Sequence, residues 1–264
     1  MSTRSTISTK DAMANPDSKT KGRMTVPKFM ARKGQMVSEH KSFAPREHPH
    51  KGPILDAWAG HYAHAFIALH PFYKQIAHQQ EVEAVSWQQV AASLSPAPFA
   101  DFALAVTLAA NGMDGKRRKD ADLRLIRDLM DYVQTHGLQY PVDGYVSAAL
   151  FPDVLRILSA LGTETCIARN QHKGREQEIT VSDLDKRAFH LEQTGALVHP
   201  TDTFIITSFP MDTYHSVVGL TADAFDLLEG NLGLEGFWAG SNTSDGWVNE
   251  KGTYSYPQWL KSPC

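Results

Sequence analysis

The stretch that most constrains the fold is Thr203 to Gly233, TFIITSFPMDTYHSVVGLTADAFDLLEGNLG. It contains three short runs rich in β-branched and aromatic residues, and each run is bounded by turn-forming residues, which is typical of strands. The runs cover residues 203–209, 215–221 and 225–229. The tight connection at Ala222 and Asp223 predicts that the last two strands form a hairpin.

His215 is the candidate functional residue of this hairpin. It begins one strand and is expected to face the end of the next, at Glu229 and Asn231. An imidazole opposite a carboxylate or an amide is the arrangement that orients a base in nucleophilic catalysis. The stretch therefore supplies a base and an orienting group but no nucleophile. The alternative for His215 is a histidine at a strand end that is hydrogen-bonded to a turn.

The rest of the chain predicts an α+β protein with a helical N-terminal half. Apolar residues at a spacing of three to four predict helices over Ile54–Leu69, Phe72–Ala92, Phe99–Ala110 and Asp120–His136. A helix over 147–161, a strand over 165–168 and a helix over 183–193 then lead into the three strands. The aromatic residues interleaved after Leu234 are expected to pack over the resulting antiparallel sheet.

Charge is spread unevenly along the chain. Residues 1–52 hold eleven Lys and Arg against four Asp and Glu, a net charge of +7, whereas the remainder carries −10. We therefore expect a basic extended arm over 1–52, a helical lobe over 53–138 and an α+β lobe over 139–264. Such an arm suits an acidic partner, which is a neighbouring subunit of a homo-oligomer, a nucleic acid or an anionic membrane surface. The alternative is a solubilising tail.

Several classes of protein are not indicated by the sequence. No apolar run reaches the roughly 20 residues of a membrane span, and no apolar signal-peptide core is evident, so a cytoplasmic protein, or one delivered into a host cytoplasm, is expected. Cys166 and Cys264 alone cannot build a disulfide framework. No zinc-type cysteine spacing and no glycine-rich phosphate motif occurs, so no cofactor is expected. His61 and His64 could share a metal-binding helical face, but packing or surface histidines are the preferred interpretation.

The segment HSVVGLTADAFDLLEGNLG, with the helix–strand–helix order before it, resembles the papain-like cysteine proteases. The similarity is to bacterial effector proteases and bacteriocin-processing peptidases, and it covers about residues 140–240. In that family a strand starting with the catalytic histidine leads to a carboxylate or amide in a turn, and these positions fall on His215 and on Glu229 or Asn231. The resemblance implies a papain-like lobe and a thiol hydrolase or amide-transferring enzyme with a protein substrate.

The nucleophile is where the chain departs from this family. The family places a cysteine at the N-terminus of the helix before the sheet, where this chain has Ser147. Cys166 is the only interior cysteine and is therefore the candidate nucleophile. Without an active thiol, the site is a degenerate one. The alternative function is a non-catalytic assembly protein, such as a coat or scaffold subunit, whose basic arm binds neighbouring subunits or nucleic acid.

Overall fold

The computed structural model describes residues 48–49, 52–75, 82–116, 118–172, 175–187, 194–209 and 213–249. All described residues belong to one compact unit, which lies within residues 42–264. Of the predicted arm, only His48, Pro49 and Gly52 are described, so the prediction for 1–52 lies almost wholly outside the described residues. Within the described ranges, no helix has the length and apolar character needed to cross a membrane.

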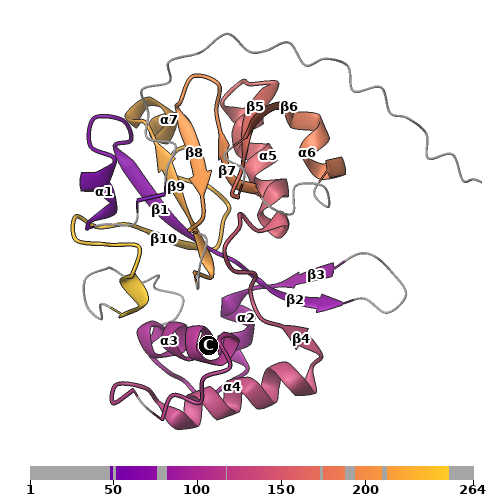
Figure 1. Cartoon of the computed structure of the whole chain (residues 1–264), viewed down its shortest axis with the longest axis vertical. Coiled ribbons are helices and arrows are strands. Elements are labelled where there is room, and N and C mark those ends of the chain that lie inside the picture. The colour runs from indigo at the N-terminus through magenta and orange to yellow at the C-terminus, as the bar shows by residue number, and fades with distance from the viewer. Residues whose placement is uncertain are drawn as a thin grey trace, which may run out of the picture. The chain divides into compact units, whose positions relative to one another are not determined.

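A seven-stranded antiparallel sheet forms the centre of the described unit (Figure 1), in the order β10-β1-β9-β8-β7-β5-β6. The strands are β1 (His64–Leu69), β5 (Thr165–Asn170), β6 (Glu176–Thr180), β7 (Thr194–Val198), β8 (Phe204–Thr207), β9 (His215–Leu220) and β10 (Gly236–Trp238). The strand register aligns one row of side chains across five strands, namely Phe66, Val218, Ile206, Leu197 and Ala168. This row defines one face of the sheet, because side chains alternate between the two faces along each strand.

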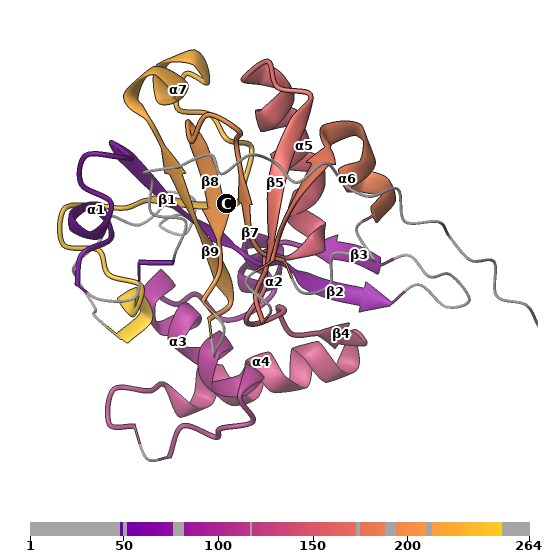
Figure 2. The same ribbon diagram turned by 45° about the horizontal axis from the view of Figure 1, so that its top comes forward.

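Helices cover both faces of this sheet. The face of the Leu197 row packs against α5 (Phe151–Ala160), α6 (Val181–Arg187) and α7 (Ala222–Leu227). The other face packs against α1 (Ile54–Ala57), α3 (Phe99–Ala110) and the short η3 helix (Trp247–Asn249). Figures 1 and 2 both show α5 and α6 beside β5. With both faces covered, every residue of β7, β8 and β9 is buried.

A second, smaller sheet continues from the first. β1 leads through His70 and Pro71 into β2 (Phe72–Gln75), which pairs with β3 (Val82–Val85) and with β4 (Leu138–Gln139). Helix α2 (Trp87–Ala92) follows β3 and starts at a capping box formed by Ser86 and Gln89. Helices α3 and α4 (Leu123–Thr135) lie side by side (Figure 2). The small sheet and these helices share one hydrophobic core with the large sheet.

The mixed α+β class with an antiparallel sheet is confirmed, together with α3, α4, α5, β8 and β9. The helices predicted over Ile54–Leu69 and Phe72–Ala92 are wrong, because these segments contain β1, β2 and β3 with only short helical turns. The strand predicted over 225–229 is also wrong, since helix α7 occupies this part of the chain. Residues on both sides of the predicted lobe boundary at 138/139 contribute to the large sheet, because β1 is one of its inner strands.

Candidate functional site

The predicted hairpin that joins His215 to Glu229 and Asn231 is not formed. β9 pairs with β8 and β1, and the chain then enters α7, where the Thr221 side chain caps the helix by accepting the Ala224 N–H at 3.3 Å. Glu229 follows α7 with a left-handed φ of 51°, and the Asn231 side chain accepts the Gly233 N–H at 3.0 Å. The motif that carries the papain-like resemblance therefore does not orient the histidine, and the likeness itself stays a prediction.

Cys166 lies far from His215 in the sheet and on its opposite face. Cys166 shares a face with Ala168 and the Leu197 row, whereas His215 shares a face with Val217, on the other side. The thiol is fully buried, and burial, helped by the charge of Glu178, raises its pKa to about 12. A thiol in this state is protonated and does not act as a nucleophile. The structure does not bring the predicted nucleophile and base together.

Ser147, His61 and His64 form no hydrogen bond with His215 within the described residues. Ser147 is buried, accepts the Ala149 N–H at 3.3 Å and shares a hydrogen bond with the Tyr73 hydroxyl. His61 lies in the turn after α1, while His64 is in β1 with its ring stacked on Phe225 at 3.8 Å, so the two histidines share no helical face. Among the described residues, no group of three or more histidine, cysteine or carboxylate side chains is arranged to hold a metal ion.

His215 does have a carboxylate partner, which is Asp245. The His215 Nε2–H donates to Asp245 Oδ1 at 3.0 Å, and His48 Nε2–H donates to the same oxygen at 2.6 Å. The side chains of His215, His48 and Asp245 are 4%, 5% and 12% exposed. Three distant segments therefore meet at one carboxylate: residue 48, the start of β9, and the turn before η3.

The charge state of Asp245 sets the tautomer of His215. Burial would raise the pKa of Asp245, but hydrogen bonds from His215 and His48 and the positive charge of these rings outweigh burial and lower this pKa below its ordinary value. An ionised carboxylate only accepts hydrogen bonds, so both Nε2 atoms must carry protons. In neutral His215 the lone pair is then on Nδ1. A carboxylate fixes the base of a catalytic triad in the same way.

Aromatic packing and backbone pairing hold His215 and Asp245 in place. Leu69 is the cross-strand partner of His215, and the His70 N–H donates to the Tyr214 carbonyl at 3.0 Å. The Trp247 ring meets His215 edge-on at 5.6 Å, and it stacks parallel on Phe99 of α3 at 5.7 Å. The turn that carries Asp245 is thus fixed to helix α3 on one side and to the base on the other.

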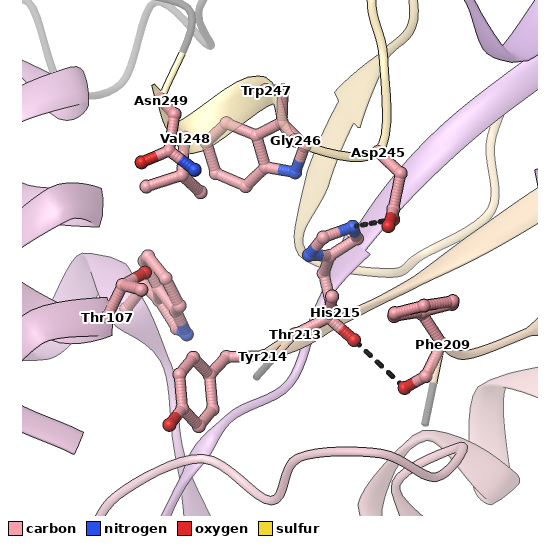
Figure 3. Close-up of a pocket in the computed structure, with 11 residues that line it drawn as sticks. Thr107, Phe209, Thr213, Tyr214, His215, Asp245, Gly246, Trp247, Val248 and Asn249 are labelled. Carbon is pink, nitrogen blue, oxygen red and sulfur yellow. Dashed lines mark hydrogen bonds and ion pairs between the residues drawn. The ribbon is translucent and has the colours of Figure 1, made fainter. Parts of the chain in front are cut away.

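The Nδ1 side of His215 opens on a pocket of about 160 Å³. Figure 3 shows the second ring nitrogen of His215 on the side of the space between Trp247, Thr107 and Tyr214. Trp87 and Phe209 add two further aromatic walls, and Asp245 lines the pocket as well. The pocket therefore combines aromatic walls with a carboxylate and an imidazole whose basic nitrogen faces inward.

A second polar cluster lies on the opposite face of β9 from His215. His70 is fully buried, and its Nδ1–H donates to the Val142 carbonyl at 2.7 Å, so Nε2 accepts from the Ser216 hydroxyl at 2.8 Å. Ser208 in turn donates to Ser216 at 2.6 Å. Burial, the largest cause, lowers the pKa of His70 to about 3, so the ring is neutral. The serine–histidine contact has no solvent access and stabilises the junction of the two sheets.

Neither His48 nor Asp245 is indicated as a partner of His215 by the sequence alone. His48 falls within the extended arm predicted over 1–52, yet its side chain is buried and contacts Phe209 at a ring distance of 5.7 Å. Asp245 sits in a Ser-Asp-Gly turn with no catalytic pattern around it. The one available signal was the aromatic C-terminal segment, of which Trp247 packs over the sheet as predicted, whereas Phe237 is part of strand β10.

The chain belongs to the family described as "Protein of unknown function (DUF2711)", whose family model matches residues 50–249. The match includes His215, Asp245 and the whole pocket, and it begins two residues after His48. No curated protein matches the chain. No solved structure matches it either.

Proposed function

We propose that the protein is a hydrolase in which His215 acts as a general base on a water molecule in the pocket. The observation that carries the proposal is the 3.0 Å contact between His215 Nε2 and Asp245 Oδ1, which directs the basic Nδ1 to the pocket. A general base must be oriented toward the proton that it takes and must have its lone pair on the facing atom. His215 meets both conditions.

Water is the nucleophile of this proposal because the pocket offers no side chain for that role. The hydroxyls of Thr107 and Thr213 donate to the backbone carbonyls of Ala103 and Phe209 at 3.0 and 3.2 Å. Cys166 is on the other face of the sheet. The reaction is therefore expected to proceed without a covalent enzyme intermediate, in contrast to the thiol chemistry of the papain-like prediction.

Each group has a defined part in the proposed reaction. His215 Nδ1 takes a proton from the water as its oxygen attacks the substrate, and the imidazolium formed is stabilised by Asp245. The same nitrogen then returns the proton to the leaving group. His48 is a positioning residue, because its 2.6 Å hydrogen bond fixes the Asp245 oxygen that His215 uses. General base catalysis of this kind contributes about 10²–10⁴ in rate.

The test is a panel of small chromogenic esters, amides and phosphoesters assayed with the full-length protein. At least one substrate should be hydrolysed, and H215Q and D245N should each lower kcat/KM about 100-fold or more. C166A, which removes the thiol of the opposite face, serves as the matched control and should retain the activity of the wild type. Hydrolysis of no substrate, or hydrolysis that survives H215Q, would overturn the proposal.

A non-catalytic assembly role is the second proposal, and the charge distribution favours it. The +7 of residues 1–52 and the −10 of the remainder allow one copy to bind another, or to bind nucleic acid, through the N-terminal segment. Removal of residues 1–47 should then weaken self-association, and the association of the full chain should weaken as salt rises. Sedimentation at low and high salt that shows no difference between the two chains would exclude this role.

A further inference from the structure

The hydroxyl groups around the pocket share one property, which is that their protons are already used inside the protein. The bonds run from Thr107 to the Ala103 carbonyl at 3.0 Å, from Thr213 to the Phe209 carbonyl at 3.2 Å, and from Tyr214 to Asn111 Oδ1 at 2.7 Å. A hydroxyl whose proton is committed elsewhere offers a ligand only its lone pairs. These three groups are therefore acceptors for anything bound in the pocket.

The charged end of the pocket is also composed of acceptors. His215 gives its Nε2–H to Asp245, which leaves the Nδ1 lone pair, and the second oxygen of Asp245 has no hydrogen bond within the described residues. The indole N–H of Trp87 donates to a backbone carbonyl at 2.7 Å, and the indole nitrogen of Trp247 is buried. The side-chain exception is Asn249, whose oxygen accepts from Arg118 at 3.0 Å and whose NH₂ remains on an exposed side chain.

The fixed charges around the pocket have the sign that suits a cation. The carboxylate of Asp245 lines the pocket and contributes a negative charge, because the pKa of Asp245 is held below its ordinary value. Arg118 is held by both oxygens of Asp120 at 2.9 and 2.8 Å, so its charge is compensated.

We propose that the pocket binds a protonated amine carried on a small apolar or aromatic body. An ammonium group has three N–H donors and no acceptor, which complements the acceptors of this pocket. Aromatic walls attract cations as well, and the volume of about 160 Å³ is close to the roughly 150 Å³ that holds a benzene ring. The inference rests on the proposed function, since it takes the same pocket to hold the substrate, and it names the group that binds beside the scissile bond.

The experiment is calorimetric titration of the full-length protein with benzylamine, benzyl alcohol and benzoate, which share a ring and differ in charge. Benzylamine should bind at least about tenfold more tightly than benzoate, since a hydrogen bond to a charged group is worth about a tenfold change or more. D245N should remove this preference, whereas D226N, which neutralises an exposed carboxylate on α7, should not. T213V removes one acceptor and keeps the carboxylate, so it should weaken benzylamine binding even where D245N fails to fold.

Tighter binding of benzoate, equal binding of all three ligands, or no binding of benzylamine would overturn the inference. Hydrolysis that requires His215 without benzylamine binding would leave the proposed function standing alone. Benzylamine binding without hydrolysis of any substrate would support a pocket for protonated amines and would overturn the proposal that His215 is a catalytic base.

Discussion

Replacement of Asp245 by asparagine should destabilise the protein in a pH-dependent way. The substitution keeps the shape of the side chain but removes the charge from the oxygen that both His48 and His215 contact, at 2.6 and 3.0 Å. The asparagine oxygen can still accept a hydrogen bond, whereas its NH₂ group cannot. Two charge-assisted hydrogen bonds in a buried position are therefore replaced by weaker neutral contacts.

The size of the effect follows from the burial of the cluster. A hydrogen bond to a charged group contributes about 1.5–3 kcal/mol, and breaking a buried charged pair by removing one partner costs about 3–5 kcal/mol. Asp245 is 12% exposed, so solvent screening is small, and we expect D245N to lower the free energy of unfolding at pH 7 by about 3 kcal/mol. For a unit of about 200 residues this corresponds to a fall in Tm of about 6–12 °C.

The lowered pKa of Asp245 determines how the stability of the protein depends on pH. The pKa of Asp245 is lower in the folded protein than the ordinary value of 3.8 for an aspartate, so the unfolded chain binds the proton more readily. The stabilisation is therefore complete above about pH 4 and is lost as the pH falls through the lower, folded-state pKa. The difference between wild type and D245N, measured by urea unfolding at a series of pH values, should shrink in this acid range.

Two controls distinguish the interaction between His215 and Asp245 from a general effect of removing a negative charge. D226N removes an exposed carboxylate of α7 and should change the free energy of unfolding by less than about 0.5 kcal/mol. A double-mutant cycle with H215A should give a coupling energy to Asp245 within about 0.5–3 kcal/mol. Equal stability of D245N and wild type at all pH values would refute the reasoning that Asp245 is the ionised centre of the cluster.

Three further predictions test the sheet. In a C264S background, Cys166 should resist iodoacetamide in the folded protein and react after unfolding, because its thiol is buried with a pKa raised to about 12, and rapid labelling of the folded protein would contradict this. G236A should lower the urea midpoint, because a Cβ there would lie 1.8 Å from the Ile67 carbonyl oxygen, and an unchanged midpoint would disprove the β1–β10 pairing. L197A should lower the free energy of unfolding by about 2–5 kcal/mol, because it leaves a cavity at a fully buried position. A decrease of less than about 1 kcal/mol, measured by thermal unfolding, would contradict the burial of Leu197 in the core.

The elements that could be predicted from the sequence are those with a single buried face or a clear boundary. Helix α4 has its apolar residues on one side, and Asp122 caps it by accepting the N–H groups of Arg124 and Leu125 at 2.9 and 3.1 Å. β8 and β9 are short runs of β-branched and aromatic residues that end at turn residues. In these segments the local pattern and the tertiary packing favour the same structure.

β1 shows why the sequence pattern of the N-terminal half predicts a helix where the structure has a strand. Its residues His64–Leu69 are nearly all buried, because one face packs on α7 and Trp238 and the other on Trp58 and α3. A strand that is buried on both faces has no alternation of polar and apolar residues, and a continuous apolar run fits a buried helix equally well. The apolar residues Trp58 and Tyr62 have helical spacing, so the helix predicted from the sequence continues into the residues of β1. In the structure the helical turns end at Gly60, whose φ is 80°. Only the pairing partners, β9 and β10, decide between the two structures.

The candidate base could be predicted from the sequence, but its partner could not. His215 was identified because it begins a strand at the end of a run of strands, which is a local property. Asp245 reaches it only because the chain after β10 crosses back to α3 and buries Trp247 against Phe99. That path depends on tertiary packing, and no residue within the Ser-Asp-Gly turn signals it. The structure does not place Glu229 and Asn231 opposite His215, because helix α7 occupies the segment that was predicted to be a strand.

The register of β9 decides which of two polar clusters is open to the pocket. His215 and Ser216 are adjacent, so their side chains point to opposite faces, one to Asp245 and the pocket and the other to the buried His70. A shift of one residue would exchange the two faces and place the neutral, enclosed cluster where the base now lies. The pairing of Leu69 with His215, the hydrogen bond from the His70 N–H to the Tyr214 carbonyl and the contact of Ser216 with His70 all fix the same register. The buried serine–histidine cluster therefore contributes to the site without touching it, because it determines that the imidazole with a free Nδ1 faces the pocket.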